Sequence, residues 1–280
     1  MHFLKMKKRN TPSYIFKQMT NILFSLLFIL SLLFLNIQQL KAQEDYLNNI
    51  EDNSKNTKGT AIWNFDVSGA IDLPMADMAK RFGTSYKIGG GIKFKTKQNW
   101  FFGAKFEFIT GNKTREDSLL WNMKTKNGII SMSGELMNVG IFERGYTTGI
   151  QVGKMFSFLQ ANQNSGPVML ASLGFMQYRI NFFDRDNSFP QLNGEYKKGY
   201  DRLSNGLYLE DFIGYQYYSK SKLINFYAGL NFLWGFTKVR RDFTFDLGRQ
   251  ETESRNDILT GFKLGWVVPI YKKKAEDTYY

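Results

Sequence analysis

The sequence predicts an all-β fold, an eight-stranded antiparallel up-and-down transmembrane β-barrel. Eight segments alternate apolar residues with polar or small ones, which is the period of a strand with two different faces. The connections between these segments alternate between long and short, as in a barrel whose two rims face different compartments. The composition agrees, because 16% aromatic residues, 26 Phe, 15 Tyr and 25 Gly in 280 residues favour strands and tight turns.

The alternation is clear in residues 223–239, LINFYAGLNFLWGFTKV, where every even position from 224 to 236 is apolar. A slip of one residue would exchange the two faces, so the register of such a strand is strongly specified. The eight expected strands lie within 60–71, 85–97, 99–110, 146–158, 168–183, 206–218, 223–239 and 257–271. The segment 168–183 is strand-like, but its pattern leaves open which residues share a face.

One face of the expected strands is apolar and aromatic, and the other is rich in glycine and charge. The lipid-facing candidates in 223–239 are Phe226, Leu230, Phe232, Trp234 and Phe236. The candidates for ion pairs in the lumen are Lys93, Lys95, Lys105, Glu107, Glu210 and Lys263. A soluble barrel of the lipocalin kind places its apolar face inside, and charges would be a poor lining for an apolar ligand. The charge on the second face therefore favours a barrel whose aromatic face meets lipid.

Long polar connections are expected near 72–84, 111–145, 183–206 and 238–256, and short ones near 97–99, 159–166 and 219–222. The longest, 111–145, carries apolar residues that are candidates for binding: Leu119, Leu120, Trp121, Ile129 and Ile130. So much apolar material in a loop predicts that it packs on itself, closes the mouth or meets a partner. The helical-looking MADMAKRF at 75–82 is expected to behave in the same way.

The N-terminal residues have the layout of a secretory signal. Five basic residues precede an apolar run from Ile22 to Leu35, which is too short to span a bilayer, and Ala42 offers a cleavage site. We expect a cleaved signal peptide at 1–42, a flexible periplasmic lead-in at 43–59, the barrel at 60–271 and a periplasmic tail at 272–280. Six of the 37 Lys and Arg residues lie in 1–42, so the remainder has 31 basic against 25 acidic residues. This balance, without a long basic run, argues against nucleic acid as a partner.

The residue content argues against catalysis. The chain has no Cys, and its one histidine is His2 in the expected signal, so the mature protein would have neither. Barrel enzymes that use a histidine as general base are thereby excluded. The run Gly89–Gly91 lies in an expected strand and matches no phosphate loop, and Asp184, Asp186 and Asp201 lack EF-hand spacing. We expect no enzyme activity, no cofactor-binding residues and no metal ligands.

Four stretches carry a family resemblance: LPMADMAKRFGTSYKIGGGIKFKTKQNWFFGAKFEFITGN (73–112), QLNGEYKKGYDRLSNGLYLEDFIGYQYY (191–218), LINFYAGLNFLWGFT (223–237) and GFKLGWVVPIYKKKAEDTYY (261–280). In these stretches the sequence resembles uncharacterised outer-membrane β-barrel proteins of Bacteroidota. The resemblance implies a location in the bacterial outer membrane, and it supplies no activity and no site residues.

These observations together predict a non-enzymatic outer-membrane barrel that is a structural or binding component of the cell envelope. An accessory subunit of an envelope export or assembly complex is one form of this function. The expected partners are outer-membrane lipid and another envelope protein, which would be reached through the long loops. Two alternatives stay open, a small passive pore and a soluble lipid-binding barrel.

Overall fold

The computed structural model describes residues 60–271, except 117–118, 122–123, 127, 131–133, 135, 138, 160, 163, 184–191, 193 and 220–223. The expected signal peptide, lead-in and tail therefore lie outside the described residues. None of the helices in the described part is long and apolar enough to cross a membrane.

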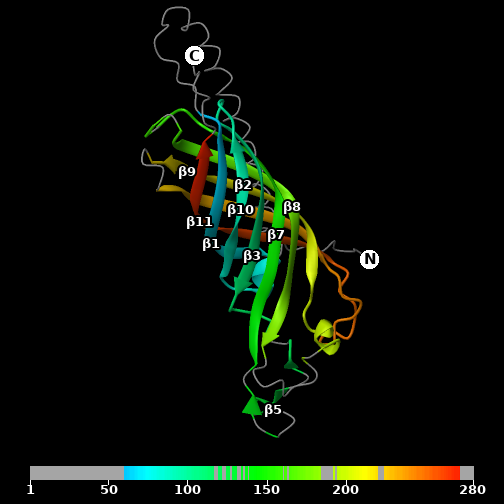
Figure 1. Cartoon of the computed structure of the whole chain (residues 1–280). Helices are drawn as coiled ribbons and strands as arrows, with labels where there is room; N and C mark the ends of the chain where they lie inside the picture. Colours follow the sequence, from blue (N-terminus) through cyan, green and yellow to red (C-terminus); the bar gives the residue numbers. More distant parts are fainter. Residues whose placement is uncertain are drawn as a thin grey trace, which may run out of the picture. The chain divides into compact units, whose positions relative to one another are not determined.

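Eight antiparallel strands close into one barrel, which confirms the predicted fold class (Figure 1). The strands are β1 (Ile62–Ala76), β2 (Ser85–Lys95), β3 (Trp100–Gly111), β7 (Gly140–Met155), β8 (Gly166–Phe183), β9 (Ser204–Tyr218), β10 (Asn225–Val239) and β11 (Ser254–Tyr271). Each strand pairs with its neighbours in the chain, and β1 pairs with β11 to close the barrel from Ile62 opposite Tyr271 to Ala76 opposite Asp257. Closure leaves no free strand edge among the eight, as a barrel in lipid requires.

The two faces of the wall differ as the sequence predicts. Val67 of β1 and Leu230 of β10 point outward and are 62% and 66% exposed, whereas their neighbours Asp66 and Asn231 are buried inside. An apolar outer face over a polar interior is the distribution of a transmembrane barrel and the reverse of a soluble one. The ambiguous segment 168–183 forms β8, whose inward Leu170 and outward Leu173 are both apolar, so that no contrast marked its faces.

The strands extend further into the expected loops than the sequence predicts. The expected connection 72–84 is wrong in its first part, because β1 continues to Ala76 and pairs there with β11. Likewise β7 begins at Gly140 and β11 at Ser254, both before the expected strand starts. The added residues mix polar or charged side chains with Pro74 and Gly140, which read as loop, yet strand pairing satisfies their backbone groups.

The connections divide the barrel into a loop end and a turn end. At the turn end lie 96–99, 156–165 and 219–224; at the loop end lie 77–84, 112–139, 184–203 and 240–253. The loop end carries the short elements α2 (Met78–Arg81), β4 (Lys124–Thr125), β5 (Gly128–Ile130), β6 (Leu136–Met137) and the 3-10 helix η3 (Tyr196–Gly199). Strands β4, β5 and β6 form a separate small sheet.

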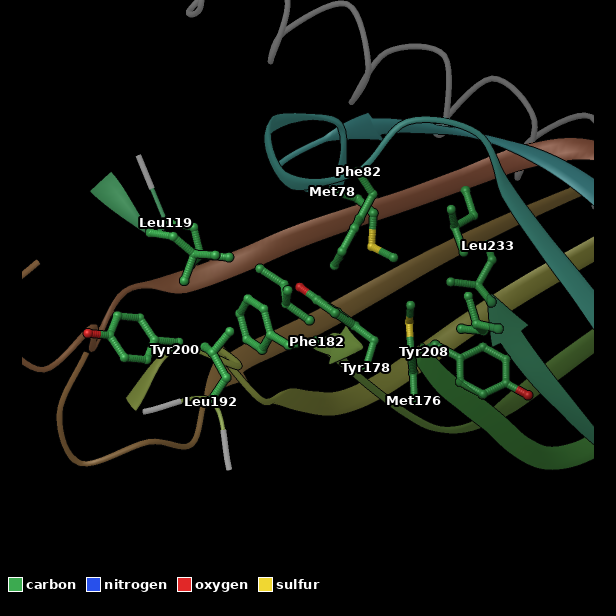
Figure 2. Close-up of a cluster of buried hydrophobic side chains, with 14 residues drawn as sticks. Met78, Phe82, Leu119, Met176, Tyr178, Phe182, Leu192, Tyr200, Tyr208 and Leu233 are labelled. Carbon is green, nitrogen blue, oxygen red and sulfur yellow. The ribbon is translucent and has the colours of Figure 1, made fainter. Parts of the chain in front are cut away.

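The interior has two apolar clusters. The cluster toward the turn end includes Ile62, Phe101, Met155 and Val267. The cluster toward the loop end continues from the barrel into the loops and includes Met78, Phe82, Leu119 and Leu233 (Figure 2). Buried charges from the middle of the strands complete the interior.

Candidate functional site

A buried group of charged side chains occupies the middle of the lumen. Lys105 of β3 hydrogen-bonds the carboxylates of Glu107, at 2.9 Å, and of Glu210 on β9. Lys263 of β11 forms an ion pair with Glu107 at 2.5 Å, and its ammonium lies 3.6 Å from Glu210. The barrel thus brings four of the six lumen candidates into one network, although they come from three separate strands.

Two residues that the sequence reasoning did not select complete this network. Lys87 of β2 lies 3.2 Å from the Asp72 carboxylate on β1 and 3.8 Å from Glu210. Asp72 also accepts a hydrogen bond from Asn231 at 2.9 Å. Lys87 shares the inward parity of Lys93 and Lys95, which could have identified it, whereas Asp72 stood in an expected loop. Three lysines therefore balance three carboxylates in this lumen cluster, defined as Asp72, Lys87, Lys105, Glu107, Glu210 and Lys263.

Lys93 belongs to a second pair nearer the turn end. Its ammonium lies 2.9 Å from Asp66 and 4.3 Å from the centre of the Tyr227 ring. The Tyr227 hydroxyl donates to the same Asp66 carboxylate at 2.8 Å. The ring fits because Gly265 stands opposite on β11, where an added Cβ would lie 2.3 Å from the ring.

Lys95 does not join an ion pair among the described residues. Its ammonium donates to the Thr60 carbonyl oxygen at 3.2 Å and to the Asn164 side-chain oxygen at 3.1 Å. The physical reason is its place at the last residue of β2, where the connection 156–165 supplies the acceptor instead of a carboxylate.

A second set of ion pairs ties the loops together above the strands. Arg81 of α2 contacts Glu251 at 2.5 Å and Glu116 at 3.2 Å, and it donates to the Ser204 hydroxyl at 3.0 Å. Arg202 contacts the same Glu116 at 2.8 Å. Burial and the neighbouring positive charge of Arg255 lower the pKa of Arg81, yet an arginine keeps its charge at physiological pH. Four loop-end connections are joined through these contacts.

Apolar side chains of the same loops gather in one buried cluster. Met78 and Phe82 belong to the same buried cluster as Leu119 and Leu120, and Phe82 meets the Tyr178 ring edge-to-face at 5.7 Å between centroids (Figure 2). Leu192 and Tyr200 lie on the loop side of this cluster. We use the name mouth plug for the apolar loop residues Met78, Phe82, Leu119, Leu120, Leu192 and Tyr200 together with the ion pairs of Arg81, Glu116, Arg202 and Glu251.

The loop candidates divide into three groups. Leu119 and Leu120 are buried in the mouth plug, so they are not available to a partner in this conformation. Trp121 is 65% exposed and remains available. Ile129 and Ile130 lie in β5, and their side chains are outside the described part of the structure.

All five lipid-facing candidates of β10 lie on its outer face. Phe226, Leu230 and Phe236 are exposed there, and Phe232 and Trp234 are partly covered. The structure also places Asp211 of β9 on this outer face, opposite Phe232 of β10 and Ala171 of β8. An acid in this position breaks the alternation of its strand, which was the available signal.

Comparisons with known proteins add no named relative. No family model matches the chain, and neither does any curated protein. Among solved structures, Neisserial surface protein A is similar at a TM-score of 0.44 with 10% identity, over 74% of this chain and 96% of that chain. Ail of Yersinia pestis, in complex with the heparin analogue sucrose octasulfate, is similar at a TM-score of 0.39 with 8% identity, over 74% of this chain and 99% of that chain. The outer membrane protein OprG of Pseudomonas aeruginosa is similar at a TM-score of 0.34 with 11% identity, over 77% of this chain and 98% of that chain. Likeness at these levels carries no argument about what this chain does.

Proposed function

We propose that the chain is a non-enzymatic barrel of the bacterial outer membrane and acts as a structural or binding component of the cell envelope through its loop end. The observation that carries this proposal is the sealed interior. The lumen cluster is buried and balanced in charge, and the mouth plug lies above it. Each charge of this cluster has an opposite partner, which supports a structural role for the lumen and leaves the loops as the surface for partners.

The outer wall supports placement in a membrane. Large apolar side chains are exposed on β1, β2, β3, β10 and β11, including Trp63, Ile88, Phe108, Leu230 and Trp266. Water would penalise that surface at roughly 25 cal/mol per Å², whereas lipid would not. A soluble lipid-binding barrel needs the reverse arrangement, so this alternative is not favoured.

A small passive pore is the second candidate function, and the burial of the lumen argues against it. Lys87 and Asp72 are shielded from solvent, and Glu107 and Glu210 nearly so. In a water-filled channel these side chains would be wet. Eight strands leave an interior that side chains can fill, and here the ion pairs and the two apolar clusters fill it.

The carboxylates of the lumen also support a structural role over a catalytic one. Glu107 and Glu210 are buried, and each is in ion-pair contact with both Lys105 and Lys263. General acid–base catalysis needs a carboxylate within hydrogen-bond reach of a substrate, and this arrangement leaves neither carboxylate open to one.

The finer form of the proposal is an accessory subunit of an envelope export or assembly complex. Its support is the exposed aromatic residues that remain at the loop end once the mouth plug has formed. Trp121 and Tyr196 are each 65% exposed on different loops, and tryptophan and tyrosine are enriched where proteins bind each other.

Site-specific photo-cross-linking in intact cells tests the binding role. A photoreactive amino acid replaces Trp121 in one strain and Leu230 in another, since Leu230 is equally exposed but lies on the lipid wall. We expect one discrete protein adduct in high yield from position 121, and lipid or diffuse adducts from position 230. Adduct patterns that are the same at both positions would contradict a specific protein partner at the loop end.

Conductance in planar bilayers separates this proposal from the pore. We expect the purified barrel to show rare, short openings. A steady open channel in the wild type, which persists when residues 112–139 are replaced by a short linker, would establish the pore and overturn the proposal.

A further inference from the structure

A groove of about 670 Å³ lies where β3, β7 and β8 run side by side near the loop end. Consecutive residues of all three strands line it, including Phe108, Arg144, Tyr146 and Arg179. Phe108, Arg144 and Arg179 are exposed there, and alternation along the strands points them away from the lumen. The groove is therefore separate from the lumen cluster, and it borders the apolar cluster of the loop end at Ile109 and Tyr178.

Two arginines face each other across this groove. Arg144 of β7 is directly opposite Arg179 of β8 in the strand register. Neither forms an ion pair with a carboxylate among the described residues. Arg144 donates to the Thr110 hydroxyl and, at 3.1 Å, to its neighbour's carbonyl oxygen, and its guanidinium lies 5.4 Å from the Phe142 ring centre. Like charges directly opposite each other destabilise a strand pair, so the arrangement calls for an anion.

A third cation adds to the excess of positive charge. Lys197 of η3 donates to the Phe182 carbonyl oxygen at 3.2 Å, close to the end of β8. Burial, and after it the positive charge of Arg179, lower the pKa of the Lys197 ammonium, and Asp201 opposes this only in part. The electrostatic effect of Arg179 thus reaches beyond the groove.

The position of the arginines along the wall indicates what kind of anion fits. Toward the turn end the outward side chains become aromatic and then aliphatic. Phe106 stacks on Tyr146 at 5.7 Å between centroids, and Tyr146 lies 6.3 Å from Phe175. Ile150 and Leu173 follow, both exposed. Toward the loop end the wall turns polar with Thr110 and Asn181. The arginines stand at the boundary between the apolar wall and polar surroundings.

The phosphate of an anionic lipid would supply negative charge to the two arginines, and it would lie at the boundary of the apolar wall where they stand. Guanidinium groups bind phosphate through paired, charge-assisted hydrogen bonds, and aromatic belts mark the level of lipid headgroups. We propose that Arg144 and Arg179 together bind the phosphate of an anionic lipid whose acyl chains lie against Phe108 and Tyr146. This site deepens the proposed function and rests on its membrane placement. Free phosphate has the same chemistry as the headgroup, but it would make no contact with the apolar wall, so a lipid fits the site better.

The test measures lipid retention by the full-length mature barrel purified in a neutral detergent. Barrels are mixed with equal amounts of phosphatidylglycerol and phosphatidylcholine, and bound lipid is counted by native mass spectrometry. The variants are Arg144→Gln, Arg179→Gln and both together. The matched control is Lys238→Gln, an exposed cation near the loop end of β10. Heat-modifiable gel mobility selects folded protein, and the single variants serve if the double variant does not fold.

We expect the wild type and the control to prefer phosphatidylglycerol, and the double variant to lose that preference by about tenfold, the effect of one or two charge-assisted hydrogen bonds. An unchanged preference in the arginine variants would overturn the site. Displacement of the lipid by millimolar inorganic phosphate would overturn its assignment to a lipid. If the barrel is folded and needs detergent, either of these two results refutes the lipid site and leaves the membrane placement intact. A chain that stays soluble without detergent refutes the membrane placement itself.

Discussion

Lys87 and Asp72 form an ion pair at 3.2 Å, and both side chains are shielded from solvent. They come from neighbouring strands, β2 and β1, and Lys87 also lies 3.8 Å from Glu210, which joins the pair to the rest of the lumen cluster. Each charge of a buried ion pair has lost its hydrating water. Removing one partner therefore leaves the other charge uncompensated and lowers the stability of the fold. This relationship makes the lumen cluster testable one partner at a time.

Lys87→Met should lower the free energy of unfolding by about 3–5 kcal/mol, because it leaves Asp72 charged and unpaired in the interior. Combining it with Asp72→Leu should recover most of that loss. Lys80→Ala is the control, since Lys80 pairs with Asp77 in solvent and should cost less than about 1 kcal/mol. Urea unfolding in phospholipid vesicles, followed by tryptophan fluorescence, measures all three. A single variant as stable as the control would show that the lumen tolerates an unpaired charge.

Glu210 and Asp211 are adjacent in β9 but lie on opposite faces of the wall. Glu210→Leu should destabilise the barrel strongly, because Lys105 would lose a partner. Asp211→Leu should raise stability by on the order of 1 kcal/mol, since a charge on the lipid face is costly at mid-membrane and acids cost less than bases. The same vesicle assay compares them. Equal losses in both variants would contradict the assignment of the two faces.

Gly265 and Tyr227 occupy one space in the lumen. Gly265→Ala should cost about 1–3 kcal/mol, because the new Cβ would lie 2.3 Å from the tyrosine ring. In a Tyr227→Ala background the same substitution should cost much less, and this coupling is the diagnostic result. Gly69→Ala on β1 is the control, since its nearest contact would be an ordinary 3.8 Å. If the double-mutant cycle shows no coupling, the proposed steric reason is wrong.

Phe82 of the mouth plug packs edge-to-face on Tyr178 of β8. Phe82→Ala removes the ring that packs against Tyr178 and should loosen the loops while the strands stay paired. We expect protease to cleave the connection 112–139 at least several-fold faster, with heat-modifiable mobility retained. Leu247→Ala, an exposed position on another loop, should leave the cleavage rate unchanged. Equal cleavage rates in the two variants would show that Phe82 does not hold the loops.

Much of the architecture was predictable from local pattern. Alternation assigned the faces of β10, and it gave the inward parity of Lys93, Lys105, Glu107 and Lys263 correctly. Strand ends were less predictable. Asp72 looked like a loop residue because its partner, Lys87, becomes its neighbour only when β1 and β2 pair. The pattern in β8 was uninformative because apolar residues lie on both of its faces.

By itself the sequence determined the eight strands of the barrel, which face of most of these strands is apolar, and that the charges belong inside. Those properties follow from the period of two, which each strand carries within itself. Only the tertiary structure decided which charges meet, that Lys95 turns to Asn164, that Leu119 is buried, and that Arg144 stands opposite Arg179. These pairings join residues far apart in the chain, and they depend on the register and closure of the barrel, which no local pattern contains.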